Sequence, residues 1–500
     1  MLLHISGLLG CPDSTFLHRL SAYCIYIHPF LPIMSPSLTT GCYDHPVPVR
    51  IQGEVEDLDP RSLPHWPRSS LTLALSAILS LIPIAQDPNS SLESSIRSRR
   101  LHANLCAKAA LGQVENEIDT ISIPTTADPY TIGEEGQFNT PVQLHPVLAL
   151  VLLSVYEYCQ RGSLPRMRSR ANQAITTAMD LSLHQLGADS TEAQRRAWWN
   201  ASPIICLGDS RISTPLPTFQ NAAVQPWALL LESEKAILSV SETFDECLVN
   251  PPTDSAACDR SKKIAHLDSH ITSIIKQLDL LKKPKYNGAI ESSAAQGMWR
   301  VATVARIRLH RSRAFMDIPL FLDKYCDLAA IQERMEATSA FDPRRTPHLD
   351  SVFPFTEQDS SLVCLKSAQV IARTLENIPI ANPHLHPFVA ADRKPNGVTG
   401  KAPYMLPFFM CAAMQGFYVL LMLHYRLRAA LESKHLPMYY YLLHSPQIDS
   451  ESQDAERLLR ELRQGMESII GAVKLAHMFE GVGSMSQEIC VAHQSTLIED

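Results

Sequence analysis

The sequence lacks closely spaced cysteines. Its twelve cysteines are scattered over 500 residues, no CxxC pair occurs, and the nearest two, Cys247 and Cys258, are eleven residues apart. A structural zinc site needs thiolates or imidazoles at short spacing, and a small disulfide scaffold needs far denser cysteine. Neither pattern is present in these residues, so we expect the reduced, mostly buried thiols of an intracellular protein.

An excess of positive charge is also absent. The 44 lysines and arginines are outnumbered by 51 aspartates and glutamates, which gives a net charge of −7. A chain with this balance has no broad attraction for phosphate backbones, so any contact with nucleic acid must be local. Glycine is scarce at 19 residues and hydrophobic residues make up 45%. This composition is typical of a globular protein rather than a disordered or fibrous one.

Signatures of chemistry and of secretion are missing as well. The sequence contains no DDxxD cluster, no GxSxG, no GxxxxGKS/T and no GxGxxG. Its apolar start lacks a basic n-region and is interrupted by His4, so a secretory signal is not expected. We therefore predict that the protein is not an enzyme, and that it has no catalytic residue, no metal-binding residue and no cofactor.

Helical periodicity is what the sequence does contain. Residues 165–186 place apolar side chains three and four positions apart, as do residues 454–480, where Leu458, Leu462 and Met466 lie on one stripe. No run alternates apolar and polar residues over the length of a strand, and no fixed-period repeat occurs. The predicted fold is therefore all-α, a large multi-helix domain with Pro/Ser-rich loops.

Prolines and polar clusters divide this pattern into segments. Helices are further expected at residues 15–34, 71–85, 91–113, 144–160, 193–207, 227–250, 264–283, 294–316, 362–377 and 405–431. Loops are expected at residues 114–143, 251–261 and 382–403.

Residues 405–423 contain no charged side chain and formally reach the length of a membrane span. Pro407, Gln415 and Gly416 lie inside this stretch, and no second span accompanies it. A helix at the centre of a large soluble bundle is equally apolar on all sides. We therefore expect a buried core helix and no membrane contact.

His266 and His270 stand four residues apart on an expected helix, a spacing at which two imidazoles can face one metal ion. The residue after His266 is not the glutamate that zinc proteases have there, and no third ligand is identifiable. A solvated helix face is the favoured interpretation.

The densest basic run could touch phosphates or a nuclear import receptor. It comprises Arg300, Arg306, Arg308, His310, Arg311 and Arg313. Because apolar residues interleave with it, an amphipathic helix with a basic outer side is favoured. Residues 96–100, reading IRSRR, form a second, weaker basic patch with the same two interpretations.

Three passages carry a resemblance to a known family. The first, YCIYIHPFLPI at residues 23–33, is a short helix followed by a His-Pro-Phe-x-Pro turn formed by His28, Pro29, Phe30 and Pro32. His28-Pro29 ends the helix, because the residue before a proline is disfavoured in helical conformation.

The second passage spans residues 148–184. An apolar helix containing Tyr156 exits at Gly162, and an Ala-rich helix ends in a Leu-x-Leu-His signature at Leu183 and His184. Just downstream lies an Arg-Arg-x-Trp-Trp core of Arg195, Arg196, Trp198 and Trp199. Adjacent tryptophans point to different sides of a helix, so each can anchor a different neighbour.

The third passage comprises ARIRLHRSRAF at residues 305–315 and PFFMCAAMQGFYVLLML at residues 407–423. Together the three resemble the middle homology region of fungal zinc-cluster (Zn2Cys6) transcription factors. The resemblance implies an all-α regulatory domain over residues 17–480, with a place to subdivide near 251–261. Residues 1–16 would be an N-terminal segment and residues 481–500 a C-terminal tail.

Members of that family read DNA through a separate N-terminal module in which six cysteines hold two zinc ions. Cys11, Cys24 and Cys42 lack the necessary spacing, so no zinc-cluster domain and no DNA-binding residue is identified. We expect zinc as a cofactor only if an upstream exon supplies the cysteine cluster.

The resemblance implies a nuclear transcription regulator of a fungal gene set, such as a metabolic or secondary-metabolite cluster. Expected partners are proteins, as a homo- or heterodimer or with coregulators, and DNA is reached indirectly or through the missing module. The alternative is a helical ligand-binding or enzyme-like protein without a role at DNA.

Overall fold

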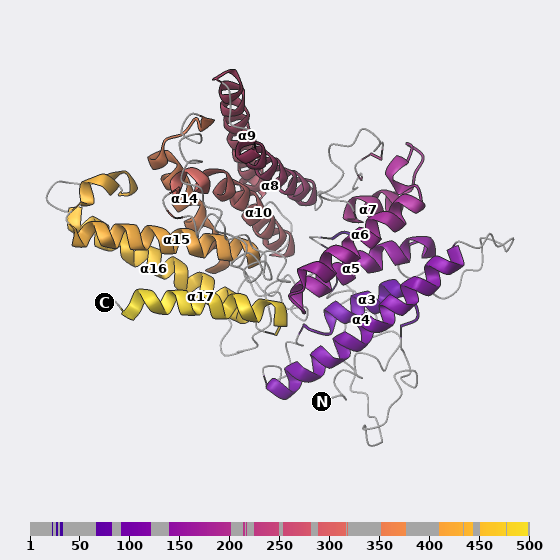
Figure 1. The fold of residues 1–500 in the computed structure, drawn as a ribbon. Helices are drawn as coiled ribbons and strands as arrows, with labels where there is room; N and C mark the ends of the chain where they lie inside the picture. Colours follow the sequence, from indigo (N-terminus) through magenta and orange to yellow (C-terminus); the bar gives the residue numbers. More distant parts are fainter. Residues whose placement is uncertain are drawn as a thin grey trace. The chain divides into compact units, whose positions relative to one another are not determined.

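The computed structural model (Figure 1) describes residues 23, 27–28, 31–33, 67–82, 92–121, 140–201, 214–215, 217, 225–249, 254–281, 289–316, 318, 352–376, 410–433, 435–443, 451–476 and 478–498. The described residues form helices and no strand, which confirms the predicted all-α fold. They belong to two compact units. Unit 1 comprises residues 1–224, 288–290 and 380–406, and unit 2 comprises residues 225–287, 291–379 and 407–500.

Unit 1 is built around α5 (His145–Cys159), an apolar helix whose side chains are buried from His145 to Leu153. Four helices pack against it: α3 (Ser70–Leu79), α4 (Glu93–Ile121), α6 (Leu164–Asp180) and α7 (Glu192–Ala201). Two short 3-10 helices, η3 (Val142–Leu144) and η4 (Leu183–Gln185), precede α5 and follow α6. The core of this unit is thus a layer of small and aliphatic side chains shared by α3, α4 and α5.

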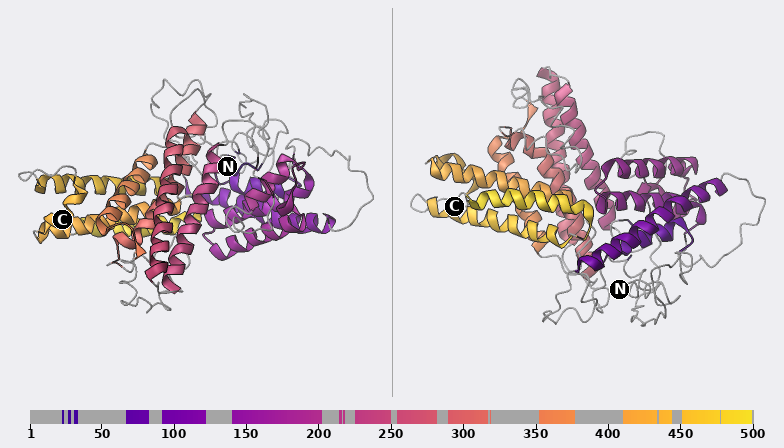
Figure 2. Two further views of the ribbon diagram at one scale, coloured as in Figure 1. Left: turned by 90° about the horizontal axis from the view of Figure 1, so that it is seen from above. Right: turned by 60° about the horizontal axis from the view of Figure 1, so that its bottom comes forward.

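Unit 2 contains a helical hairpin, α8 (Gln225–Val249) and α9 (Asp254–Leu281), followed by α10 (Ala289–Ala314) and α14 (Glu357–Glu376). Its C-terminal part consists of α15 (Met410–Glu432), η8 (Leu436–Leu442), α16 (Glu451–Leu475) and α17 (Glu480–Ile498). α14, α16, α17 and η8 all pack against α15. Figures 1 and 2 show α15, α16 and α17 running alongside one another.

α16 lies close to α15 at Gly465. A Cβ atom added to Gly465 would lie 2.9 Å from Cδ1 of Leu420 in α15, closer than real Cβ atoms come to another side chain. A larger residue at this position would therefore require the end of the Leu420 side chain to move. α15 is buried at every residue from Ala412 to Leu421, so the expected core helix is confirmed for the part of residues 405–423 that is described.

Among the described residues, one helical stretch, Val142–Cys159, is long and apolar enough to cross a membrane. Most of its side chains are buried inside the protein. This is the burial expected of α5 at the centre of unit 1.

Two predicted loops proved to be partly helical. α4 continues to Ile121, into the loop predicted at 114–143, because Val114 extends the apolar spacing of Cys106 and Ala110. α9 begins at Asp254, inside the loop predicted at 251–261. In the rest of the loop predicted at 114–143, Thr140 and Pro141 are irregular and η3 begins at Val142, whereas residues 122–139 and the whole of 382–403 lie outside the described residues.

Helices pack at the places expected for a subdivision and for a tail. α8 and α9 pack against each other within unit 2, and His270 Nε2 lies 3.5 Å from Glu232 Oε2 between them. The chain passes from unit 1 to unit 2 after Val224, and residues 288–290 and 380–406 belong to unit 1 again. Residues 480–498 form α17, which buries Val482, Met485 and Ile489 against unit 2.

Candidate functional site

The described signature positions of the second passage lie together in unit 1, on α5, α6, η4 and α7. Tyr156 is buried in α5, which ends at Cys159, and Gly162 in the exit from the helix has φ of 60°. The Gly162 N–H donates to the carbonyl of Tyr158 at 3.1 Å, as in a left-handed helix cap. Arg161 lies over the Tyr156 ring at 5.6 Å and donates to Asn104 Oδ1 of α4 at 2.6 Å.

The Leu-x-Leu-His signature forms the turn after α6. Ser182 adopts φ of 57° and Leu183 is buried in η4. The Thr214 hydroxyl donates to the carbonyl of Leu183 at 2.6 Å and accepts from the N–H of Leu186 at 3.0 Å. One threonine thus fixes this turn to the chain that follows α7.

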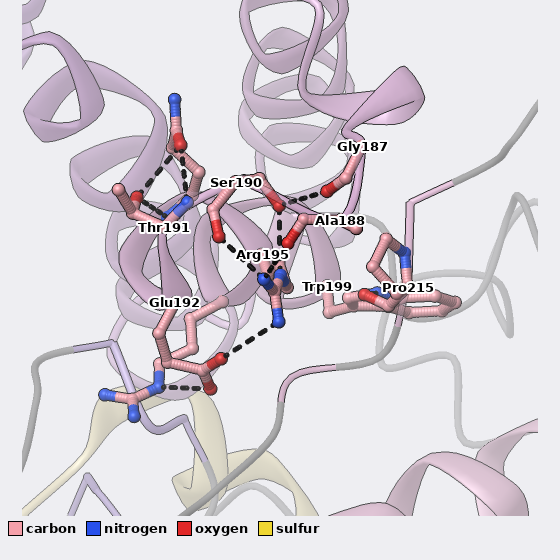
Figure 3. Close-up of polar contacts among 10 residues, drawn as sticks. Gly187, Ala188, Ser190, Thr191, Glu192, Arg195, Trp199 and Pro215 are labelled. Carbon is pink, nitrogen blue, oxygen red and sulfur yellow. Dashed lines mark hydrogen bonds and ion pairs between the residues drawn. The ribbon is translucent and has the colours of Figure 1, made fainter.

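Arg195 holds the turn that leads into α7 (Figure 3). Its Nη2 donates to the carbonyls of Ser190 at 2.7 Å and Ala188 at 3.0 Å, and its Nε donates to Ser190 Oγ at 3.0 Å. Thr191 and Gln194 add a capping box, because each side chain accepts from the other residue's N–H, at 3.3 and 2.9 Å. The start of α7 is therefore fixed by side chains of its own first turns.

The two tryptophans of α7 contact different neighbours, as predicted. The Trp198 ring is buried and lies 5.9 Å from the His184 ring. Trp199 Nε1 donates to the carbonyl of Pro215 at 3.0 Å, and Figure 3 shows its ring directed toward this proline. Trp198 therefore binds α7 to the turn after α6, and Trp199 binds it to the downstream chain.

The first passage is linked to the second electrostatically, through His28 and Arg196. The charge of Arg196 adds to burial, the larger cause, in lowering the pKa of His28 to about 4. His28 is thus neutral at ordinary pH, and its Nδ1, 3.1 Å from the Tyr23 hydroxyl, can accept that proton. Arg196 Nε in turn donates to Glu192 Oε1 at 3.3 Å. Pro32 is buried, whereas Pro29 and Phe30 lie outside the described residues.

These contacts are structural in kind. The tryptophans, Leu183 and Tyr156 fill the core, and Arg195 and Thr214 satisfy backbone groups. The signature positions of unit 1 hold the ends of α5, α6 and α7 in one arrangement.

A second polar cluster lies in unit 2, at the helix for which the sequence predicted a basic outer side. The basic run of α10 was expected to face outward, but His310 and Arg311 are 0% and 5% exposed. α10 is buried over most of its circumference in its last four turns, with Val304, Ile307 and Leu309 buried as well. A helix of this kind lies inside a bundle, so its basic side chains need partners there.

His310 connects three helices. Its Nε2 lies 3.2 Å from Asp268 Oδ1 of α9, and its Nδ1 lies 3.2 Å from Ser360 Oγ of α14. Arg306 Nε donates to the same Asp268 oxygen at 3.0 Å. Burial by itself raises the pKa of Asp268, but hydrogen bonds from His310 and Arg306, together with their charges, outweigh it and hold the pKa below its ordinary value.

The Asp268–His310–Ser360 order resembles a nucleophilic triad, but its burial argues for a structural role. Ser360 and His310 are both 0% exposed, so this conformation gives a substrate no access to the serine hydroxyl. Asp268 is shared with Arg306 rather than reserved for the imidazole. The cluster therefore joins α9, α10 and α14 through paired polar groups.

Arginines also connect α10 to α15. Arg311 Nη1 donates to Gln415 Oε1 at 2.7 Å, in the buried centre of the bundle. Arg426 Nη1 donates to the carbonyl of Ala314 at 2.8 Å, and its guanidinium lies 5.0 Å from the centre of the Phe315 ring. These partners lie more than a hundred residues apart, and nothing in the local sequence around α10 identifies them.

In the described part of the chain, no three His, Cys, Asp or Glu side chains are placed to hold a metal ion. His266 is exposed on α9 and His270 faces Glu232, which agrees with the favoured solvated face. The described cysteines form no disulfide; Cys106, Cys159 and Cys364 are buried, and Cys258 is exposed. Burial, opposed by nearby arginines, raises the pKa of Cys364 to about 12.

No protein-family model, no curated protein and no solved structure matches this chain.

Proposed function

We propose that these residues form the helical regulatory body of a nuclear transcription regulator, acting on a gene set such as a metabolic or secondary-metabolite cluster. The observation that supports the proposal is the convergence of the signature positions in unit 1. Leu183 of η4 and Trp198 of α7 are both buried, the ring of His184 in η4 lies 5.9 Å from that of Trp198, and the charge of Arg196 acts on His28 of the first passage. Residues chosen by resemblance alone would not be expected to share contacts.

The kind of contact made at these positions also favours a regulatory body over a catalyst. Most of the described signature residues are buried in the core or bound to backbone carbonyls and N–H groups. Such residues maintain a shape, and a protein of this sort acts through its surface by binding other proteins. The proposed partners are accordingly a second regulator subunit and coregulators.

DNA is reached through another module or a partner in this proposal. The net charge is −7, and the densest basic run contributes His310 and Arg311 to the interior of unit 2. Charges enclosed in this way cannot neutralise phosphates, which is the main source of affinity for a duplex.

The test is a tethering experiment. The 500-residue chain is fused to an unrelated sequence-specific DNA-binding domain, and transcription is measured from a reporter with the matching operator. We expect transcription to rise or fall about tenfold or more relative to the DNA-binding domain alone, the change that ~1.4 kcal/mol of recruitment free energy gives. A Trp198→Asp fusion, which places a carboxylate in the core of unit 1, should lose the effect.

The matched control is Trp199→Phe. It keeps an aromatic side chain and removes the hydrogen bond to Pro215 and part of the ring, a smaller disturbance than a buried carboxylate, so it should retain most of the effect. A stable, nuclear wild-type fusion that left transcription unchanged would refute the proposal. The alternative, a helical ligand-binding or enzyme-like protein without a role at DNA, would then be preferred.

A further inference from the structure

Two large apolar side chains lie on the outside of unit 1. Leu101 is 61% exposed and Leu105 is 39% exposed, and both belong to α4. α4 packs on α3 and α5 through its opposite side, which buries Ala103 and Ala110. Residues four positions apart are neighbours on the surface of a helix. Leu101 and Leu105 therefore form one exposed apolar group, which we call the leucine pair.

Basic side chains border the leucine pair at both ends and on one side. Arg97 lies one turn before it and Lys108 lies about one turn after it, and both are exposed. Arg161 approaches from the end of α5, because its Nη2 donates to Asn104 Oδ1 of α4 at 2.6 Å. Asn104 lies three residues after Leu101, so this guanidinium is held beside the pair.

Acidic side chains are scarce around the leucine pair. From its first residue to the far border of the pair, α4 carries one acidic residue against four basic ones: Glu93, Arg97, Arg99, Arg100 and Lys108. Glu93 lies four residues before Arg97 and can offset its charge. The carboxylate of Glu157, which pairs with Arg161, is buried. The surface around the pair therefore keeps a positive charge.

The neighbouring helices do not neutralise this charge. α6 begins at Leu164, three residues after Arg161, and carries the exposed Arg166 and Arg168 in its first turns. It has no acidic residue before Asp180, its last. The N-terminus of a helix is also the positive end of its macrodipole. α3, which packs on α4, contains no charged residue at all.

We propose that the leucine pair and its basic border are a docking surface for an acidic, amphipathic segment of another protein. Apolar side chains of that segment cover Leu101 and Leu105 and remove them from water. Its carboxylates pair with Arg97 and Lys108, the exposed cations at the two ends. An apolar centre with a charged rim is the usual anatomy of a protein interface, and the rim steers the partner and fixes its register.

The combination of apolar and basic groups selects this partner over two others. A nucleic acid offers phosphates to the cations, but its backbone has no apolar group to cover the leucines. A second copy of this surface brings an equal positive charge against it. The inference goes beyond the proposed function, which names protein partners without a surface or a chemistry. Peptide binding is measured without transcription, so either proposal can fail alone.

The experiment is fluorescence anisotropy of a labelled synthetic peptide titrated with the full chain. The peptide is a helix of about 15 residues, with leucines four positions apart and glutamates on both sides of them. We expect a Kd on the order of 10–100 μM, because the contact is small. Raising NaCl from about 50 to about 300 mM should weaken binding severalfold. Peptides with serine for leucine, or lysine for glutamate, should bind about tenfold more weakly.

Variants of the chain locate the site. Leu101→Ser and the double change Arg97→Glu with Lys108→Glu should each weaken binding of the acidic peptide about tenfold. The double variant should bind the lysine peptide more tightly than the wild type does, a gain that misfolding cannot produce. The matched controls, Leu280→Ser and Lys276→Glu, change exposed residues of α9 in unit 2 and should leave binding unchanged. Circular dichroism checks that each variant keeps its helices.

Three results would overturn the proposal. The first is no binding of the acidic peptide at about 100 μM chain, the upper end of the expected range. The second is equal losses for the α4 variants and the α9 controls. The third is a DNA duplex that binds as tightly as the peptide and is displaced by it, which would mean that the surface recognises negative charge alone.

Discussion

Arg311 is the clearest case of a residue whose role is decided by one distant partner. Its side chain is 5% exposed, and its guanidinium donates to the amide oxygen of Gln415 at 2.7 Å. A buried charge is tolerable only where it is hydrogen-bonded. A charge on the surface of α10 would have added little to stability. In the core, the Arg311 guanidinium needs the hydrogen bond to Gln415 to offset the loss of its hydration.

Gln415→Leu is expected to destabilise unit 2 by about 2 kcal/mol, because it removes an acceptor from a buried charged donor. Chemical denaturation of the full chain, followed by circular dichroism, measures the loss. Gln415→Glu keeps an acceptor at the same place and should cost less. Equal losses for the two variants would show that the volume of the side chain matters here and the hydrogen bond does not.

His28 gives unit 1 a dependence on pH. Its folded pKa is about 4 against 6.5 for an unperturbed histidine. Between these values the unfolded chain binds more protons, so stability is complete above about pH 6.5 and falls as the pH is lowered toward 4. The full shift corresponds to at most about 3 kcal/mol.

The check is the free energy of unfolding at about pH 7, 5.5 and 4.5 for the wild type and for His28→Gln. Glutamine can still accept the Tyr23 hydroxyl proton but does not titrate. The free energy of unfolding of His28→Gln should therefore fall less steeply than that of the wild type as the pH is lowered over this range. If the free energies of unfolding of the two proteins fell in parallel with pH, His28 would not be the source of the pH dependence.

At the scale of the element, the local sequence predicted where helices occur better than it predicted the residues at which they begin and end. The apolar spacing of residues 144–160 and 454–480 corresponds to α5 and α16, because a helix that buries one stripe must repeat it every three or four residues. The start of α9 and the whole of α17 were missed. Residues such as Val482, Met485 and Ile489 did carry the signal, but glycines and polar residues around them made it weak.

Gly162 tests how a helix end is fixed. Its φ of 60° is unfavourable for any residue with a Cβ, so Gly162→Ala should destabilise the end of α5 by ~1 kcal/mol. Gly471 in α16 has open space around it, so Gly471→Ala should stabilise its helix by up to ~1 kcal/mol. Hydrogen exchange of each helix, measured by mass spectrometry, should shift in opposite directions for the same substitution. A shift of the same sign in both would refute this account.

At the scale of the whole molecule, the all-α fold followed from the absence of strand patterns, but the division into units did not follow from composition. The prolines near residue 251 looked like a boundary, yet the helices on either side of them, α8 and α9, pack against each other within unit 2. In the candidate site, the signature residues were found by resemblance, and Trp198 and Trp199 contact different neighbours as expected. The cluster around His310 could not be found, because its partners are 42 and 50 residues away in the chain.

The separation between Arg311 and Gln415 also has a consequence for synthesis. A ribosome adds about 5–20 residues per second, so the 104 positions between them take on the order of 5–20 s to translate. During this interval α10 has emerged, but α15, which supplies Gln415 and Arg426 as hydrogen-bond partners of α10, does not yet exist. A nascent chain in this state exposes surface that chaperones recognise, and a message cut short before α15 would yield a product destined for proteolysis.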